Sequence, residues 1–252
     1  MNTRILTLLI ALTVSPAQAG NDDAQTNPRS GAPAEWGEAM NLGMLFGQVL
    51  FDRLEAGYAD AEDNYAWDAQ AWYGGDYHKL RLKTEGEGRQ GEPVESADLE
   101  LLYSRNVAAY WDLQAGLRHD FEPAPSRSHL AVGVQGMAPY LFEVDATAYL
   151  REDGLFSAAL EAEYDLLITQ RLILQPRLEF ALQAEDDPER ATGAGLTGTE
   201  LGIRLRYEIR REFAPYIGFN WSQSYGRTAD LRRADGEATS SNALVVGVRA
   251  WF

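Results

Sequence analysis

The sequence predicts an all-β fold, a transmembrane antiparallel β-barrel of about 12 strands. One observation is a series of segments in which apolar and charged residues alternate, as in strands with one face in lipid and one in water. A second is the spacing of these segments, because short turns alternate with longer loops. A third is the apolar stretch SNALVVGVRAWF, which finishes on Phe252. An even number of strands would place both termini on the periplasmic side of an outer membrane.

Composition excludes several classes of function. The chain has 252 residues, enough for one large β domain, and its formal charge of −16 argues against a surface that neutralises phosphates. We therefore expect no nucleic-acid partner. The chain has no cysteine, which excludes disulfides, thiolate nucleophiles and thiolate metal sites.

The start of the chain has the pattern of an exported protein. Residues 1–19 are predicted to be a signal peptide, because Arg4 lies in a short basic region, residues 5–14 are apolar and residues 17–19, AQA, match a cleavage site. Residues 20–47 begin with GNDDAQTNPRSGAP, which has no periodicity, and are expected to form a flexible N-terminal periplasmic segment. The barrel is expected to occupy residues 48–252.

The first half of the barrel is expected to contain six strands. In KLRLK and WDLQAGLRHDF, one parity is mostly apolar and the other carries most of the charge. Turn signals such as GGD, GEGRQGEPV and PAPS separate the segments. The predicted strands are residues 48–60, 64–74, 77–86, 95–106, 109–121 and 127–137.

The second half continues the same pattern. TELGIRLRYEIR sets leucine, isoleucine and tyrosine against glutamate and arginine, and LFEVDATAYLR and SAALEAEYD alternate in the same way. Residues 185–197 and 226–239 are expected to be long loops, and no helical stretch interrupts the strands convincingly. The predicted strands are residues 140–151, 155–166, 170–184, 198–211, 213–225 and 240–252.

A charged inner face is expected along the lumen, where opposite charges would pair. Its acidic cluster lies on two neighbouring predicted strands and is interpreted as favouring cations. The members of that cluster are Glu143, Asp145, Glu161, Glu163 and Asp165. The other residues predicted to face inward are Arg53, Glu55, Asp68, Lys79, Arg81, Lys83, Asp98, Glu100, Asp112, Arg118, Asp120, Arg171, Arg177, Glu179, Arg204, Arg206, Glu208 and Arg249.

Candidate metal ligands are few. Imidazole nitrogen suits Cu(II) and thioether sulfur suits Cu(I). His129 is expected to face the lumen and His119 the outer rim. Met40 and Met44 lie just before the first strand, where the alternative interpretation is an apolar plug or a pair of interface residues. No HExxH or CxxC motif is present. The candidate ligands are Met40, Met44, Met137, His78, His119 and His129, with Asp120 as a helper.

Several blocks carry a resemblance to a known family. FDRLE (51–55), AWDAQAWYGGD (66–76), KLRLKTEGE (79–87), WDLQAGLRHDF (111–121), GVQGMAPYLFEVDATAYL (133–150), EAEYDLLITQRLILQPRLE (161–179) and RYEIRREFAPYIGFNW (206–221) are similar to the copper resistance protein B family. The resemblance implies a Gram-negative outer-membrane protein that binds copper, as Cu(I) or Cu(II), or passes it across the membrane. It also implies a periplasmic multicopper oxidase as partner. Members often carry a Met- and His-rich N-terminal arm, which residues 20–39 lack.

Two other functions remain open at this point. One is a narrow outer-membrane channel for small charged solutes. The other is a hydrolase on the barrel wall, which would need a nucleophile such as Ser126 or Ser128 near His129. We expect a monomeric barrel in contact with outer-membrane lipid, and no enzymatic activity.

Overall fold

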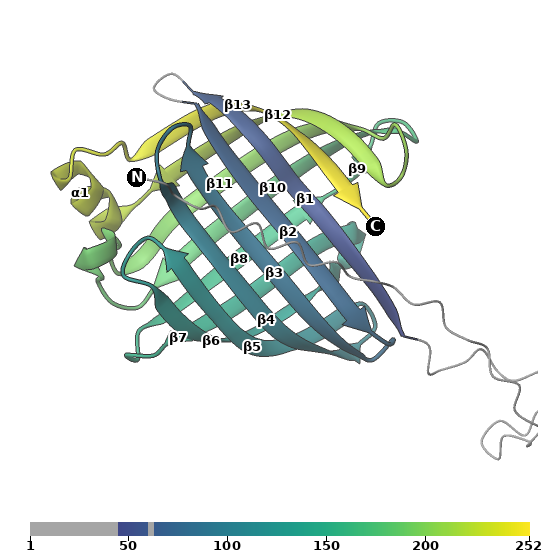
Figure 1. The fold of residues 1–252 in the computed structure, drawn as a ribbon, viewed down its shortest axis with the longest axis horizontal. Helices are drawn as coiled ribbons and strands as arrows, with labels where there is room; N and C mark the ends of the chain where they lie inside the picture. The colour runs from purple at the N-terminus through teal and green to yellow at the C-terminus, as the bar shows by residue number, and fades with distance from the viewer. Residues whose placement is uncertain (1–44, 60–62) are drawn as a thin grey trace, which may run out of the picture. The chain divides into compact units, whose positions relative to one another are not determined.

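The computed structural model describes residues 45–59 and 63–252 of the chain (Figure 1). The predicted signal peptide, most of the segment 20–47, Met40 and Met44 lie outside the described residues. The described elements are β1 (Phe46–Ala59), β2 (Asn64–Gly74), β3 (His78–Arg89), β4 (Val94–Ala108), β5 (Trp111–Glu122), β6 (Arg127–Ala138), β7 (Phe142–Arg151), β8 (Phe156–Tyr164), β9 (Leu166–Leu167), β10 (Leu172–Gln183), β11 (Gly195–Tyr207), β12 (Phe213–Ser224), α1 (Gly226–Ala234) and β13 (Ser240–Trp251).

The strands close into an antiparallel barrel. Neighbours in the sequence pair with one another, and β1 pairs with β13, which closes the sheet formed by residues 45–59 and 63–252. The short β9 continues β8 in the same register against β10, and that register places Pro176 opposite Tyr164. Since proline has no amide hydrogen to donate, the ladder is interrupted at this position. With β8 and β9 counted as one wall strand, the barrel has the predicted 12 strands.

The outer face of the barrel is apolar. Five leucines on β3 to β7 are cross-strand partners of one another and form a belt across this part of the wall. All five are exposed, which would be unfavourable in water and is required in lipid. Among the described residues, no helix is both long enough and apolar enough to span a membrane. The leucines of this belt are Leu82, Leu101, Leu117, Leu130 and Leu150.

The inner face is polar and densely paired, as the alternation predicts. Arg177 and Arg206 are each 2% exposed although they are charged, because they project into the lumen and contact carboxylates. Leu102 is one of the few large apolar side chains buried on this face. Lipid outside and paired charge inside therefore account for the period-2 pattern.

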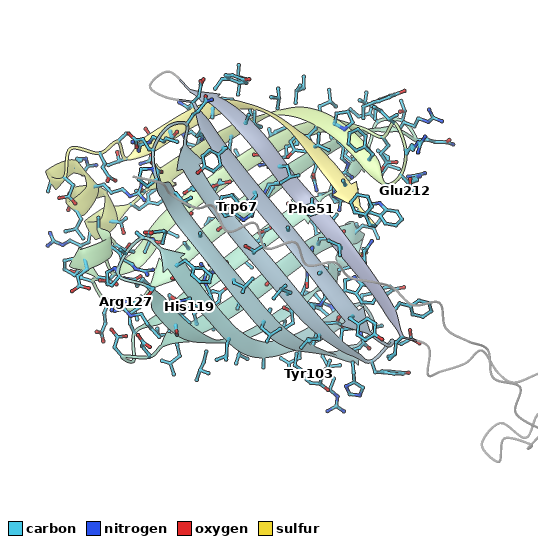
Figure 2. The ribbon with its side chains drawn as sticks, in the orientation of Figure 1. Phe51, Trp67, Tyr103, His119, Arg127 and Glu212 are labelled. Carbon is cyan, nitrogen blue, oxygen red and sulfur yellow. The ribbon has the colours of Figure 1, made fainter. Side chains whose placement is uncertain are left out.

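The two ends of the barrel differ. The turn end carries the connections 75–77, 109–110, 139–141, 168–171 and 208–212, together with the start of β1 and the end of β13. The loop end carries the end of β1, the start of β2 and the connections 90–93, 123–126, 152–155, 184–194 and 225–239. Figure 1 shows α1 at the loop end and the C-terminus at the turn end, and Figure 2 places His119 and Arg127 toward the loop end and Tyr103 and Glu212 toward the turn end.

Local details depart from the sequence pattern. The connection 226–239 contains the nine-residue helix α1, whose Thr228 accepts a 2.9 Å hydrogen bond from the backbone of Gly193. Arg171 does not reach the lumen, because it lies exposed in the turn 168–171. β11 ends at Tyr207 rather than near residue 211, since residues 208–212 form the turn to β12.

Candidate functional site

Three cavities follow one another through the lumen. The turn-end cavity has a volume of about 410 Å³, the central cavity about 80 Å³ and the loop-end cavity about 280 Å³. Asp145 and Glu161 line both the turn-end and the central cavity. Glu85, Asp98 and Glu179 line both the central and the loop-end cavity, together with Arg118. The central cavity is thus the narrow link between two wider ones, and carboxylates lie at both of its ends.

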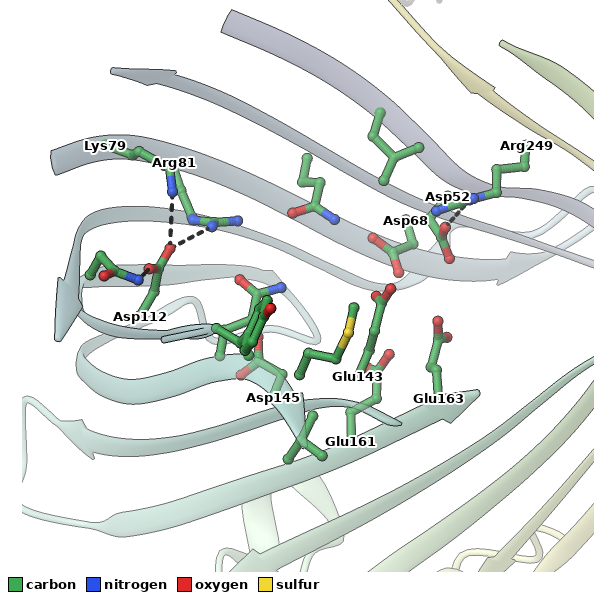
Figure 3. Close-up of a pocket in the computed structure, with 18 residues that line it drawn as sticks. Asp52, Asp68, Lys79, Arg81, Asp112, Glu143, Asp145, Glu161, Glu163 and Arg249 are labelled. Carbon is green, nitrogen blue, oxygen red and sulfur yellow. Dashed lines mark hydrogen bonds and ion pairs between the residues drawn. The ribbon is translucent and has the colours of Figure 1, made fainter. Parts of the chain in front are cut away.

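The turn-end cavity is acidic. Asp112 pairs with Lys79 at 3.3 Å and with Arg81 at 3.1 Å, and Figure 3 shows these contacts at one side of the cavity. Carboxylates outnumber basic side chains by seven to three, so a cation entering here meets an attractive field. The seven are Asp52, Asp68, Asp112, Glu143, Asp145, Glu161 and Glu163, and the three are Lys79, Arg81 and Arg249.

A β-bulge adds one of these carboxylates. The register of β1 against β2 shifts between Phe51 and Arg53, so Asp52 and Arg53 both contribute to the lumen although they are neighbours in sequence. Asp52 accepts a 2.6 Å hydrogen bond from Arg249 on β13. Strict alternation predicts Asp52 on the outer face, and it is therefore absent from the predicted inner residues.

The predicted acidic cluster is largely brought together. Figure 3 shows Glu143, Asp145, Glu161 and Glu163 gathered on one side of the turn-end cavity. In the ladder of β7 with β8, Glu143 lies opposite Glu163 and Asp145 lies opposite Glu161. Asp165 is the exception, because it pairs with Arg206 at 2.7 Å and does not line this cavity.

A row of four carboxylates runs across four neighbouring strands. Asp145 on β7 faces Glu161 on β8, Glu161 faces Glu179 on β10, and Glu179 faces Glu200 on β11. We call Asp145, Glu161, Glu179 and Glu200 the carboxylate row. Like charges directly opposite each other are destabilising in a sheet, so the row needs cations beside it. The row touches all three cavities, from Asp145 in the turn-end cavity to Glu200 in the loop-end cavity.

Arg177 is the main fixed countercharge of the row. It lies 2.6 Å from Glu161, 3.0 Å from Glu179 and 3.3 Å from Glu200, and its side chain is 2% exposed. Arg53 adds a second contact to Glu200, at 3.6 Å. Asp145, at the turn-end side, is paired instead with Lys83, which reaches it from β3 with a separation of 2.5 Å.

The loop end is covered by the connection 184–194, which is fastened to β5, β6 and β7. Arg190 donates to Asp120 at 2.7 Å and to the carbonyl of Pro125 at 2.8 Å. Asp187 pairs with Arg151, and Glu189 pairs with Arg127. These contacts hold the connection over the mouth of the loop-end cavity, which Arg190 lines.

The neighbouring connection 152–155 takes part in the same charge network. Arg151 hydrogen-bonds both oxygens of Asp153, at 2.7 and 2.6 Å. These hydrogen bonds hold the pKa of the Asp153 carboxyl well below its ordinary value, so the contact persists into acid. Arg151 therefore binds two carboxylates at once, Asp153 and Asp187.

The candidate copper ligands are not assembled into one site. Nδ1 of His129 is buried and lies 3.9 Å from Asp120, but Asp120 already binds Arg118 and Arg190. His119 faces outward and stacks edge-on against Phe121, and exposed His78 stacks on Tyr103 at the turn end. Among the described residues, no three His, Asp, Glu or Cys side chains are grouped to hold a metal.

Met137 is the candidate ligand that the structure places in a cavity. Its residue lines the turn-end cavity together with Glu143, Asp145 and Glu161. A thioether and several carboxylates therefore border the same space, a combination that offers soft and hard donors to one cation. Met40 and Met44 lie outside the described residues.

The hydrolase hypothesis required Ser126 or Ser128 near His129, but the structure pairs Ser128 with His119 instead. Ser128 and His129 point to opposite sides of β6, and the Ser128 hydroxyl contacts Nδ1 of His119 at 2.9 Å on the outer face. Among the described residues, no carboxylate or amide forms a hydrogen bond with the second ring nitrogen of His119. The pair thus lacks the third group that orients a catalytic histidine.

Some residues that line the lumen are not among those predicted to face inward. Glu85 and Glu87 line the loop-end cavity and share the parity of Lys83. Glu85 lies within the predicted strand 77–86 and could have been assigned to the lumen by parity alone, whereas Glu87 requires the strand to be extended beyond residue 86. Asp187 and Arg190 lie in a connection without periodicity, and no sequence signal points to them. Their role depends on contacts with strands that are distant in sequence.

Comparison with known proteins gives a consistent result. A family profile described as "Copper resistance protein B precursor (CopB)" matches residues 45–252. The chain is 48% identical over 204 residues to "Copper resistance protein B" of Escherichia coli, and the matched region covers 81% of this chain and 69% of that protein. It is 45% identical over 203 residues to the "Copper resistance protein B homolog" of Pseudomonas syringae pv. tomato, covering 80% and 68%. The NanC porin structure matches with a TM-score of 0.53 at 13% identity, and the match covers 79% of this chain and 98% of that one. At this identity the similarity shows the fold alone.

Proposed function

Because this chain belongs to the copper resistance protein B family of the Gram-negative outer membrane, we propose that it passes copper ions through the lumen of its barrel. A role in copper resistance follows from the family. Passage through the lumen, rather than binding alone, is the proposal that the geometry supports best.

The carboxylate row is the observation that carries this proposal. It borders all three cavities in succession, and its four acids are accompanied by only a few basic side chains. A ring or row of carboxylates attracts cations and repels anions. The fixed arginines beside it limit how tightly a cation is held, which conduction requires.

The size of the central cavity favours a small ion. Its volume of about 80 Å³ leaves room for an ion with few waters and not for an organic solute of ordinary size. This supports copper over the small charged solutes that the sequence left open.

The donor types also suit copper as cargo. For a given set of oxygen ligands, affinity among first-row divalent ions peaks at Cu²⁺, and the thioether of Met137 would suit Cu(I) at the turn end. The ligands are spread along the lumen and not gathered around one point, as expected for a path rather than a storage site. His129, His119, His78 and Asp120 remain proposed as weak contacts.

We place the turn end on the periplasmic side, because short turns face the periplasm in outer-membrane barrels. In this orientation copper enters from the periplasm at Met137, where we propose that a periplasmic multicopper oxidase delivers or receives it. Met40 and Met44 lie outside the described residues and remain proposed as further thioether contacts for Cu(I). We propose that the barrel works as a monomer.

Copper flux into proteoliposomes tests the proposal. The purified barrel is reconstituted around a copper-sensitive dye, and the rate of quenching is compared with that of empty liposomes. Wild-type protein should carry copper, and replacement of Asp145 and Glu161 by Asn and Gln should slow it because the narrow link loses its attraction. The matched control is Asp230→Asn, in an exposed ion pair of α1 that lines none of the three cavities.

Two results would contradict the proposal. One is copper flux equal to that of empty liposomes, and the other is equal copper flux in wild type and the Asp145/Glu161 variant.

A strain without the gene should also differ from wild type in copper tolerance and cellular copper content. A difference in tolerance without any flux would favour a binding role.

We propose that the outer-face pair of Ser128 and His119 is a structural cross-strand contact. It lies at the loop end of a lipid-facing wall, and a polar pair is tolerated near such an interface. Hydrolysis of a p-nitrophenyl ester or a phospholipid by wild type, abolished by Ser128→Ala, would overturn this view.

A further inference from the structure

The two lysines of the chain have a special position. Lys79 and Lys83 are the only lysines in the sequence, and both lie on the inner face of β3. Every other permanently basic side chain is an arginine. Arginine binds carboxylates through a rigid planar fork, whereas lysine carries a compact charge on a flexible stem. A lysine in the lumen is therefore the basic side chain best able to move.

Lys83 lies at the smallest of the three lumen cavities, which shares lining residues with both of the others. Its side chain lines the central cavity, and its ammonium contacts Asp145, which borders both the central and the turn-end cavity. Lys83 and Asp145 come from β3 and β7, strands that are not neighbours, so the contact spans part of the lumen. A cation that moves between the two cavities has to pass this pair.

The basic groups near the central cavity differ in how firmly they are held. Arg118, at the loop side, contacts Asp98, Glu100 and Asp120 and also stacks on the ring of Tyr149 at 4.9 Å. Lys83 forms one ion pair within the described part of the chain. Lys83 also lies opposite Glu100 in the ladder of β3 with β4, but it makes no ion pair with it at 4.0 Å or less, so Lys83 has one close contact to lose and Arg118 has four.

The ammonium of Lys83 also resembles the cargo. It is a compact monovalent cation, and it occupies the position at Asp145 that a passing ion would take first when it leaves the turn-end cavity. While Lys83 is there, the charge of Asp145 is satisfied and the link is partly filled. When Lys83 moves aside, Asp145 is free to attract an ion, while Glu161 beside it stays paired with Arg177.

We propose that Lys83 is a tethered-cation gate that decides how readily cations cross the lumen. Passage exchanges the ammonium of Lys83 for the incoming ion at Asp145, and the ammonium returns after the ion has left. This inference rests on the proposed function only in that ions cross the lumen, and it holds for any small cation.

Single-channel recording in planar bilayers tests the gate, with 0.1 M KCl to limit screening. Lys83→Gln should raise K⁺ conductance by about tenfold, which corresponds to a barrier lower by about 1.4 kcal/mol. It should also raise the preference for K⁺ over Cl⁻, measured from the reversal potential in a salt gradient. Lys83→Arg should conduct no better than wild type, because it retains the charge.

Asp145→Asn separates a gate from a structural ion pair. It removes the acid that attracts the ion and leaves the ammonium in the lumen, so cation preference should fall while in Lys83→Gln it rises. A pair that only supports the wall would change conductance in the same direction when either partner is removed. The matched control is Lys79→Gln, which removes the same charge from the wider cavity, where Arg81 still neutralises Asp112. Its effect should be much smaller.

The absence of cysteine from the chain allows a test that is independent of folding. In Lys83→Cys, a methanethiosulfonate reagent that adds an ammonium to an already inserted channel should reduce K⁺ current. A neutral reagent of similar size should reduce it less. Equal block by both reagents would mean that size and not charge controls the link.

The gate is refuted if Lys83→Gln conducts like wild type or if Lys79→Gln shows an equal rise in conductance. It is also refuted if Lys83→Gln and Asp145→Asn shift the cation preference in the same direction.

The copper proposal can fail independently of the gate. If Lys83→Gln raises K⁺ current while neither protein carries copper into liposomes, the gate stands and the copper route does not. If both carry copper and K⁺ equally, the copper route stands and the gate does not.

Discussion

At the residue scale, Glu55 and Arg204 illustrate how charge is stabilised inside the barrel. Arg204 donates two hydrogen bonds to Glu55, at 2.5 and 3.2 Å, and Tyr216 donates a third at 2.9 Å. Both charged side chains are less than 5% exposed. Since β11 and β1 are separated by β12 and β13, the contact ties the wall together beyond the ladder hydrogen bonds.

Glu55→Gln should therefore destabilise the barrel. It leaves Arg204 as a buried charge without its carboxylate, and breaking a buried pair in this way costs about 3 kcal/mol. Urea unfolding in lipid vesicles should show the loss in the free energy of unfolding. Asp230→Asn, whose ion pair with Arg233 is about 60% exposed, should cost less than about 0.5 kcal/mol. Equal costs for the two variants would contradict this account of the Glu55 contact.

Met137 gives a second prediction at this scale. A thioether has no proton to gain, so Cu(I) binding at the turn end should change little between about pH 5 and 7, whereas binding by histidine would weaken below about 6.5. Met137→Leu, which keeps the volume and removes the sulfur, should weaken Cu(I) binding in a competition assay with a chromogenic chelator. His129→Gln should have little effect, and a reversal of these two results would move the copper contact to the loop end.

At the element scale, the connection 184–194 acts as a cover over the loop end. Its fixation depends on side chains, because Asp187, Glu189 and Arg190 each pair with a residue of the wall on β5 to β7. Asp187 is buried, and its backbone also bridges to Thr192. A connection held by charges opens locally at lower cost than a ladder strand.

Asp187→Asn should release this cover. Within the described part of the chain, the variant leaves Arg151 with Asp153 as its one ionic partner. The open population should therefore rise by at least about tenfold, a change of about 1.4 kcal/mol. Trypsin cleavage after Arg190 in intact cells should then accelerate by a similar factor, since cleavage follows the open population. An unchanged cleavage rate, with Asp230→Asn as the control, would show that the cover is held by other contacts.

At the scale of the whole molecule, closure of the sheet is the main source of stability in lipid. β1 and β13 complete the ladder, and Phe252 exchanges two backbone hydrogen bonds with Val49, at 3.0 and 2.9 Å. Because each wall strand in the described part of the chain pairs on both sides, the described sheet presents no open edge to the hydrocarbon. The aromatic C-terminal residue thus has a structural place in the closing seam.

The closed barrel should be resistant to SDS until heated. Without boiling, the protein should migrate faster on a gel than the boiled sample, because the folded barrel stays compact. Deletion of Trp251 and Phe252 removes the end of the closing seam and should abolish the shift at a lower temperature than in wild type. No shift at any temperature, with circular dichroism dominated by helix, would refute the barrel.

Much of the wall could be predicted from the sequence, because lipid and water impose opposite polarities on alternate residues. The strand TELGIRLRYEIR reveals both of its faces without any partner. The same argument placed His129 in the lumen and His119 outside, and both positions are confirmed. It failed at Asp52, since a bulge changes the parity of β1 and leaves no mark in the sequence.

The sequence by itself determined the polarity of the two faces, the number of wall strands and the acidic character of the lumen, because each depends on local alternation and composition. Only the tertiary structure decided the register that aligns Asp145, Glu161, Glu179 and Glu200, and the contact of Lys83 with Asp145. The register depends on which residues face one another across strands. Contacts through the lumen depend on closure, which brings together side chains that are 62 residues apart.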